Sequence, residues 1–200
     1  KHGHILAVKG IGGYLLLCDA TKHYSVSTLR DRKHRPSRPF AVLYPSIEKA
    51  EEDLLITNKE KQALLSKQAP IVLCELKEEP ASGICTEQVA PGLGRIGALL
   101  PYTGLLTLIA EGWGKPLVAT SGNLSGSPII YTDEEALLWL TDYADYIISY
   151  ERVIVSPQDD SVMQFGRYST HPIILRRSRG LAPNYFPTPF LHTQPILAMG

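Results

Sequence analysis

Short apolar segments alternate with helix-like segments along the chain, and this alternation limits the possible folds more than any other feature. Continuous apolar runs of a few residues between turn residues are typical of buried strands, and amphipathic segments between them would cover the sheet. The pattern therefore predicts an α/β or α+β sheet domain. Strands are expected at residues 4–8, 14–18, 40–44, 71–76, 117–120, 147–148, 153–155, 161–165 and 173–176, and helices at 21–33, 46–55, 58–67, 105–113 and 132–143.

The size and composition are those of one ordinary globular domain. The chain has 200 residues, 44% of them hydrophobic and 20% charged, and Lys plus Arg (20) equals Asp plus Glu (20). This balance favours no particular charged partner. The three cysteines, Cys18, Cys74 and Cys85, show no CxxC spacing and indicate a reduced, cytoplasmic protein. No apolar run approaches the roughly 18 residues of a membrane span.

Two segments lack regular patterns. Residues 77–94 are rich in Pro, Gly and charge, which predicts a long loop that is either functional or mobile. After Gly180 the chain becomes rich in proline, which is typical of a linker. The predicted domain therefore covers residues 1–183, and residues 184–200 form a separate tail. The first residue is Lys1 and the end is apolar, so both ends are expected to be cuts from a longer protein.

A basic run stiffened by prolines is the first candidate site. Residues 30–38 (RDRKHRPSR) carry five Lys or Arg and one Asp. Lys33 offers a point charge and Arg35 a planar fork suited to phosphate or carboxylate, while Pro36 and Pro39 restrict the backbone. A solvated basic helix end is an equally good interpretation. Lys33 and Arg35 are both expected to face solvent.

Polar groups also follow several predicted strands. Ser121 and Asn123 lie in a glycine-containing turn, where α/β sheets tend to bind ligands. Asp159 and Asp160 precede a strand and could bind Mg²⁺ or orient basic groups. Each pattern is also compatible with an ordinary polar turn. Two further patterns are the glycine-rich turn 9–13 (KGIGG) and the arginine-rich end 176–180 (RRSRG).

Together and in this order, these segments resemble the YrdC-like domain of the HypF carbamoyltransferases, which act in hydrogenase maturation. The resemblance runs collinearly from residue 3 to about 183. The matching strings are KGIGGY (9–14), LRDRKHRP (29–36), PFAV (39–42), LPYT (100–103), TSGNLSG (120–126), DDSV (159–162) and RRSRG (176–180). Residues 195–200 (PILAMG) look like the first strand of the carbamoyltransferase (Kae-like) domain that follows in HypF.

The resemblance implies a fold and a reaction. The fold would be a twisted mixed sheet with flanking helices and a concave, basic ligand-binding surface. Carbamate, released from carbamoyl phosphate in an adjacent domain, would attack the α-phosphate of ATP and give carbamoyl adenylate and pyrophosphate. The carbamoyl group would then pass to the C-terminal cysteine of the partner HypE. ATP and Mg²⁺ are the implied cofactors.

The resemblance also assigns residues to this reaction. Lys33 and Arg35 would be catalytic. Lys9 would bind ATP or carbamate, and Ser121, Asn123, Ser161 and Arg177 would bind ATP and its phosphates. Asp160 would hold Mg²⁺ or orient the basic groups. No cluster with the spacing of a protein metal site is expected.

One departure and two alternatives accompany this interpretation. HypF proteins usually carry a proline and a histidine pair after the PYT string, whereas Gly104, Leu105, Leu106 and Thr107 stand here, which puts that wall of the pocket in doubt. The first alternative is a threonylcarbamoyl adenylate synthase acting in tRNA modification. The second is a double-stranded RNA-binding module, which zero net charge disfavours.

Overall fold

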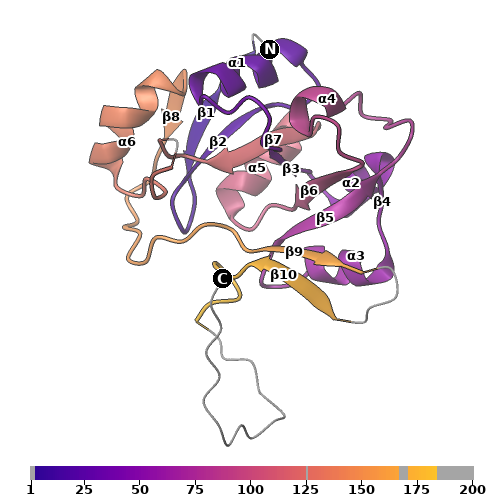
Figure 1. The fold of residues 1–200 in the computed structure, drawn as a ribbon. Coiled ribbons are helices and arrows are strands. Elements are labelled where there is room, and N and C mark those ends of the chain that lie inside the picture. The colour runs from indigo at the N-terminus through magenta and orange to yellow at the C-terminus, as the bar shows by residue number, and fades with distance from the viewer. Residues whose placement is uncertain (1–2, 125, 167–170, 184–200) are drawn as a thin grey trace, which may run out of the picture.

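A single twisted sheet runs through the molecule (Figure 1). The computed structural model describes residues 3–124, 126–166 and 171–183. In this part of the chain ten strands pair in the order β10–β9–β5–β6–β3–β7–β2–β1–β8, with β4 beside β5. Most pairs are antiparallel, and β1–β8, β3–β6 and β5–β9 are parallel. The strands are β1 (Leu6–Lys9), β2 (Tyr14–Asp19), β3 (Ala41–Leu43), β4 (Leu54–Leu55), β5 (Ile71–Leu76), β6 (Arg95–Leu99), β7 (Leu117–Ser121), β8 (Tyr146–Ile148), β9 (Val162–Phe165) and β10 (Pro172–Arg176).

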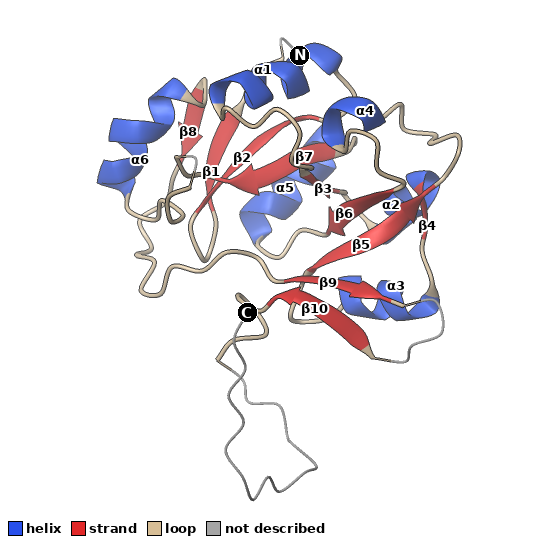
Figure 2. Cartoon of the chain, viewed as in Figure 1, coloured by secondary structure: helices blue, strands red, loops and turns tan. Residues whose placement is uncertain are grey.

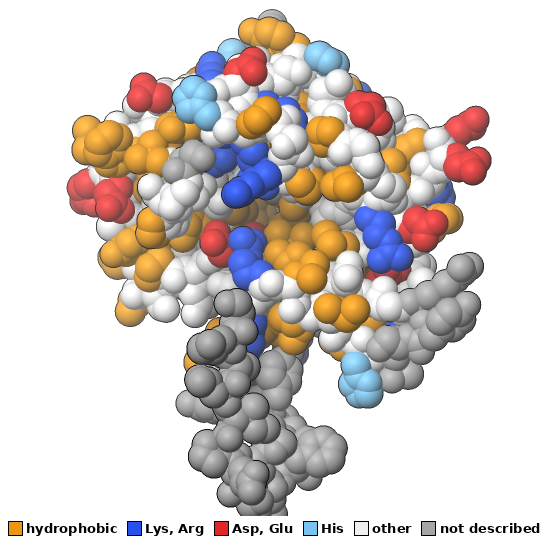
Figure 3. Space-filling view, viewed as in Figure 1, with side chains coloured by type: hydrophobic (Ala, Val, Ile, Leu, Met, Phe, Trp, Pro, Cys, Tyr) orange, Lys and Arg blue, Asp and Glu red, His pale blue; other side chains and the backbone are white. Residues whose placement is uncertain are grey.

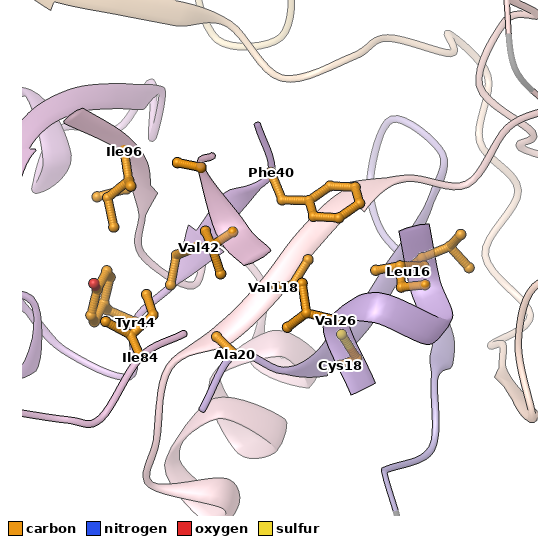
Figure 4. Packing of buried hydrophobic residues seen from close by; sticks show 14 of the residues in the cluster. Leu16, Cys18, Ala20, Val26, Phe40, Val42, Tyr44, Ile84, Ile96 and Val118 are labelled. Atoms are coloured by element: carbon orange, nitrogen blue, oxygen red, sulfur yellow. The ribbon is translucent and has the colours of Figure 1, made fainter. Parts of the chain in front are cut away.

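One face of the sheet is covered by several helices (Figure 2). Alternate residues of the central strands, among them Leu16, Val42 and Val118, pack there against helical residues such as Val26 and Val89 (Figure 4). This cluster forms the larger part of the core. The helices that contribute to it are α1 (His23–Arg32), α2 (Ile47–Asp53), α3 (Asn58–Leu64), α4 (Thr86–Val89), α6 (Asp133–Trp139) and the short 3-10 helix η1 (Leu140–Asp142).

The opposite face is covered over only part of its area, by α5 (Gly104–Trp113). Leu106 and Ala110 of α5 pack there on a row of paired leucines, Leu99, Leu43 and Leu117. Two residues further along the same strands the paired row is Gly97, Ala41 and Ala119. These small side chains rise little above the sheet, so this row lies lower than the leucine row, and the Ile71 side chain packs over Gly97, where a Cβ atom would lie 2.7 Å from Ile71 Cγ2.

Side chains cap the helices much as the sequence indicates. Thr57 and Glu60 stand at the spacing of a capping box in the sequence, and the structure forms it: Thr57 accepts a hydrogen bond from the Glu60 amide, and the Glu60 carboxylate accepts one from the Thr57 amide. The side chains of Thr132 and Thr103 cap α6 and α5 by accepting hydrogen bonds from the amides of Glu135 and Leu106. Among the described residues, no helix is both long enough and apolar enough to cross a membrane.

Several predicted elements differ from the structure. The expected strand at 153–155 is wrong: these residues form no strand, and Val153 and Val155 are exposed. The expected loop 77–94 contains the short helix α4 and turns its apolar residues, including Ile84 and Val89, into the core. Strand β6 was not predicted, since Gly92, Gly94 and Gly97 give its segment the composition of a loop. The predicted tail, 184–200, lies outside the described residues.

The glycine-rich segment 9–13 is the turn of the β1–β2 hairpin, and it packs against the residues that precede β9. The Gly12 carbonyl accepts a hydrogen bond from the Gln158 amide at 2.9 Å. A Cβ atom on Gly12 would lie 2.2 Å from the Gln158 carbonyl oxygen. Only glycine therefore allows the close approach that fixes Asp159, the next residue along the chain.

We predict that Gly12→Ala displaces this segment and lowers the free energy of unfolding by about 1–3 kcal/mol. Gly112→Ala is the matched control, because a Cβ atom there meets nothing within 4 Å and lies on the exposed side of α5. That control should raise stability by up to about 1 kcal/mol. Urea unfolding of the two variants and the parent checks both values. Equal stability of Gly12→Ala and the parent would contradict the packing argument.

Candidate functional site: a cleft over the uncovered sheet face

A cleft lies over the row of small residues that α5 leaves uncovered. Its apolar part is a hollow of about 220 Å³ whose floor includes Leu15, Ala41, Leu73, Gly97 and Ala119. A more polar hollow of about 650 Å³ adjoins it. The two share Arg35, Ser121, Asp159 and Arg176 as lining residues. Figure 3 shows an apolar hollow near the centre of this face, with Lys and Arg side chains at its border.

The end of helix α1 determines where the basic run enters the cleft. Lys33 is the last residue with helical geometry, and His34 has φ +48°, in the left-handed region. The His34 amide donates to the Asp31 carbonyl at 3.1 Å, and the Arg35 amide to the Arg30 carbonyl at 3.0 Å. This pair of bonds is a Schellman motif. It turns the chain sharply, so that Lys33 and Arg35 both line the polar hollow.

Lys33 is buried, which corrects the expectation that it faces solvent. Its side chain donates to the Ser121 carbonyl at 2.8 Å, the Asn123 carbonyl at 3.1 Å and the Asn123 Oδ1 at 3.0 Å. An ammonium group has three N–H donors, and these three acceptors match them. Burial, and then the neighbouring Arg35, lower the pKa of Lys33 to about 8. The residue is therefore both a tether to the loop after β7 and a charge that an anion would stabilise.

Arg35 is half-buried and spans both hollows. Its guanidinium donates to the Thr120 hydroxyl at 3.3 Å and to the Pro39 carbonyl at 2.5 Å, and it lies 5.0 Å from the centre of the Phe40 ring. Burial lowers the pKa of Arg35, and so do the nearby Arg30, Arg38 and Arg176. Mutual repulsion among these cations would be relieved by a bound anion.

Ser121 and Asn123 lie where the sequence places them, at the end of β7 and in the following loop. The Ser121 hydroxyl donates to Asn123 Oδ1 at 3.0 Å, and the Asn123 amide nitrogen donates to the Ser127 carbonyl at 2.7 Å. Together with Lys33 they form one connected polar cluster in the cleft. Their assignment to ATP remains a prediction, but the structure brings them together.

Arg176, rather than Arg177, lines the cleft. Arg176 is the last residue of β10, and its Nη1 lies 3.7 Å from Asp159 Oδ2. Arg177 is exposed and is not among the residues that line either hollow. Side chains of adjacent residues along a strand point to opposite sides of the sheet. The assignment therefore named Arg177, whereas its neighbour Arg176 is the one that faces the cleft.

Asp160 borders the apolar hollow, and its carboxylate is bound by the buried guanidinium of Arg179. Both Arg179 Nε and Nη2 lie 2.8 Å from Asp160 Oδ1, and the pair is almost fully buried. Ser161 is also buried: its hydroxyl donates to the Arg179 carbonyl at 2.8 Å and accepts from the Ser178 amide at 2.8 Å. In this conformation both residues brace the 176–179 segment. The phosphate role predicted for Ser161 would require it to exchange these partners.

Lys9 lines neither hollow of the cleft. Its ammonium is buried and forms an ion pair with Asp133 Oδ1 at 2.7 Å, and it donates to the Tyr150 carbonyl at 3.0 Å. Tyr14 and Ser149 donate to the same carboxylate, and the three partners lower the pKa of Asp133 to about 2. The structure gives Lys9 a partner from α6 and does not bring it beside Lys33, so its predicted role in ATP binding remains untested.

Among the charged lining residues, Arg38, Asp159 and Arg176 received no role from the resemblance, although Asp159 and the arginine-rich end were noted as candidate patterns, and the Thr120 hydroxyl was also left without a role. Three of these four residues directly neighbour an assigned residue, so the motifs were found but the facing side chains were not assigned. Asp159 is the more exposed carboxylate of the pair that the sequence singled out. Among the described residues, no group of three or more His, Cys, Asp or Glu side chains is arranged to hold a metal.

The cleft thus combines two chemically different parts. The apolar floor suits a flat, weakly polar group. The cations at the border of the floor, Lys33, Arg35 and Arg176, form a rim that suits a multiply charged anion. Asp159, the carboxylate that both hollows share, is the residue that would face a Mg²⁺ ion accompanying such an anion. Nucleoside triphosphates carry both kinds of group.

We predict that the left-handed geometry of His34 makes this position sensitive to branched side chains. His34→Val should lower the free energy of unfolding by about 1–2 kcal/mol, whereas His34→Gly should stay within about 1 kcal/mol of the parent. His23→Val, at an exposed position in the first turn of α1, is the control and should change stability by less than about 0.5 kcal/mol. Urea denaturation measures all three, and similar losses at positions 34 and 23 would contradict the prediction.

Comparison with known proteins identifies sequence relatives over the full chain. A family model for Sua5, YciO and YrdC proteins, described as "Telomere recombination", matches residues 1–178. The carbamoyltransferase HypF of Synechocystis sp. is 43% identical over 200 residues, which is 100% of this chain and 25% of the relative. The probable carbamoyltransferase HypF of Methanocaldococcus jannaschii is 38% identical over 202 residues, with the same coverage. The chain therefore spans about a quarter of the length of these curated relatives.

Solved structures show the same likeness. A full-length HypF in a phosphate- and nucleotide-bound form matches with a TM-score of 0.82 and 41% identity, over 90% of this chain and 28% of that one. T. kodakarensis HypF matches with a TM-score of 0.83 and 38% identity, over 90% and 23%. P. abyssi Sua5 complexed with L-threonine has a TM-score of 0.74 at 19% identity, over 88% and 51%, which shows the shared fold alone.

Proposed function

The chain belongs to the Sua5/YciO/YrdC family, as a domain of the HypF type, and on this basis we propose that it binds ATP in the cleft and uses it to activate carbamate. The product would be carbamoyl adenylate, with pyrophosphate released. The HypF relatives are named carbamoyltransferases, which supports a reaction of the carbamoyl-transfer type.

One observation carries the proposal: the joining of the apolar floor to a rim that holds Lys33, Arg35 and Arg176. The row of small side chains leaves room for the flat base, and the rim then lies where the phosphates would extend. Buried or half-buried cations close to one another are costly without an anion. A triphosphate supplies that anion, and its affinity would come in part from relieving the repulsion around Arg35.

The residues suggest how the reaction would proceed. A carbamate oxygen attacks the α-phosphorus of ATP, an O–P bond forms, and the bond from that phosphorus to the oxygen bridging the α- and β-phosphates breaks as pyrophosphate leaves. Such a transfer needs positioning and charge stabilisation rather than covalent catalysis. Arg35 and Arg176 would donate to the phosphate oxygens, and Lys33 would keep the Ser121–Asn123 loop in place. Mg²⁺ would supply further neutralisation of the triphosphate, facing Asp159.

The remaining steps would take place in other parts of a longer protein. We propose that an adjacent domain produces carbamate from carbamoyl phosphate and that another transfers the carbamoyl group to the C-terminal cysteine of HypE. Passing an unstable acyl adenylate between domains of one chain avoids its hydrolysis in bulk water. This assignment rests on the HypF relatives, of which the chain is about a quarter.

Pyrophosphate exchange into ATP tests the proposal directly. Exchange is expected with a mixture of bicarbonate and ammonia, which contains carbamate, and Arg35→Ala should lower its rate by about a hundredfold or more. Exchange that requires L-threonine as well as bicarbonate would instead assign the chain to threonylcarbamoyl adenylate synthesis. Absence of ATP binding, together with retained binding of double-stranded RNA, would favour the RNA-binding alternative.

The floor of the cleft can be tested by filling it. Ala119→Leu places a larger side chain at the centre of the hollow row, and it should weaken ATP binding by about tenfold or more while leaving the affinity for inorganic pyrophosphate nearly unchanged. Ala81→Leu is the matched control, because Ala81 is exposed and lines neither hollow. Isothermal titration calorimetry measures both ligands. Equal losses for ATP and pyrophosphate would contradict the assignment of the base to the floor.

A further inference from the structure

Arg30 makes more hydrogen bonds than any of the residues assigned to the cleft, yet it lines neither hollow. Its side chain is buried near the end of α1. On one side its guanidinium donates to the carbonyls of the basic loop: Nη1 to Arg35 at 2.7 Å, Arg38 at 3.0 Å and Pro36 at 3.3 Å. The loop that carries Arg35 into the cleft is therefore folded around this group.

The same guanidinium joins the basic loop to a second segment. Its Nε donates to the Gln88 carbonyl at 2.6 Å, and its Nη2 donates to the Val89 carbonyl at 3.2 Å. These residues end α4, which lies in the long segment between β5 and β6. The planar fork of an arginine has five N–H donors, and all three of its nitrogens are used here: the two N–H groups of Nη1 serve three carbonyls, while Nε and Nη2 serve one each. A lysine at this position would have three donors and no fixed plane.

Arg30 is also a buried charge without a carboxylate partner among the described residues, since its acceptors are neutral carbonyls. Burial lowers its pKa. Its guanidinium lies 4.5 Å from the centre of the Phe40 ring, and that of Arg35 lies 5.0 Å from the same ring. Arg30 is one of the cations that lower the pKa of Arg35. The charge of Arg30 thus adds to the field at the rim of the cleft.

We infer that Arg30 is a positioning residue of the nucleotide site, which holds Arg35 in its binding geometry through the backbone of residues 35–38. It touches no substrate and acts through Arg35. The inference rests on the proposed function, because it assigns Arg35 to the phosphates of ATP. It goes further in naming a buried arginine, outside the lining of the cleft, as a determinant of affinity.

A double-mutant cycle between positions 30 and 35 tests this coupling. Arg30→Met should weaken ATP binding by about tenfold in the parent, but by less than about twofold in an Arg35→Met background. Arg30→Lys, which keeps the charge and loses the fork, should fall between parent and Arg30→Met. Arg32→Met is the matched control on the same helix end, where Arg32 pairs with Asp145 at 2.9 Å, and it should leave ATP affinity unchanged.

A second readout does not depend on ATP. In the NMR spectrum the Nε–H signal of Arg35 should be protected from solvent exchange in the parent and lose this protection in Arg30→Met, but not in Arg32→Met. Equal effects of Arg30→Met with and without Arg35, or an unchanged Arg35 signal, would overturn the inference. If Arg30→Met does not fold, the cycle is made with Arg30→Lys. Failure of that variant to fold would assign Arg30 to folding alone.

The two proposals can fail separately. A parent chain that binds no ATP would overturn the proposed function, while the Arg35 signal would still report whether Arg30 orders the loop. Conversely, normal ATP binding in every Arg30 variant would overturn the inference and leave the proposed function standing.

Discussion

The buried ammonium group of Lys33 connects the two segments that form the polar side of the cleft. It belongs to the end of α1, and its hydrogen bonds reach the loop after β7, about ninety residues further along the chain. A charge that is removed from water must be matched by polar partners, so the Ser121–Asn123 loop cannot move independently of the helix end. The positions of the Ser121 and Asn123 carbonyls follow from this requirement. The polar side of the cleft thus depends on satisfying one buried cation.

The uneven covering of the sheet creates the rest of the site. Several helices bury one face, whereas α5 covers only part of the other. If every strand carried large side chains throughout, the uncovered part would expose a broad apolar surface. Gly97, Ala41 and Ala119 reduce that surface and make it concave. The sizes of the side chains along β6, β3 and β7 therefore determine both where α5 packs and where the floor of the cleft lies.

Sequence reasoning found the motifs more reliably than it found the geometry. The alternation of elements gave the fold class, and the capping box at Thr57 fixed the start of α3. Strand β6 was missed because its glycine, which the hollow requires, resembles a loop residue. Arg176 was missed because choosing between adjacent arginines needs the register of β10, which the sequence does not reveal. Arg30 escaped notice because five carbonyls from two segments meet it only in the folded chain.

The small residues of the floor, Ala41, Gly97 and Ala119, lie on β3, β6 and β7, at the middle of the sheet and away from both of its edges. Backbone amides in such strands open only when most of the domain unfolds, whereas loop residues fluctuate far more easily. The floor is already ordered before a ligand binds. The conformational entropy lost on binding therefore comes mainly from the side chains and loop of the rim. Under the proposed function, a change of residues at the rim could alter the acyl group accepted, while the rigid floor would still receive the base of the nucleotide.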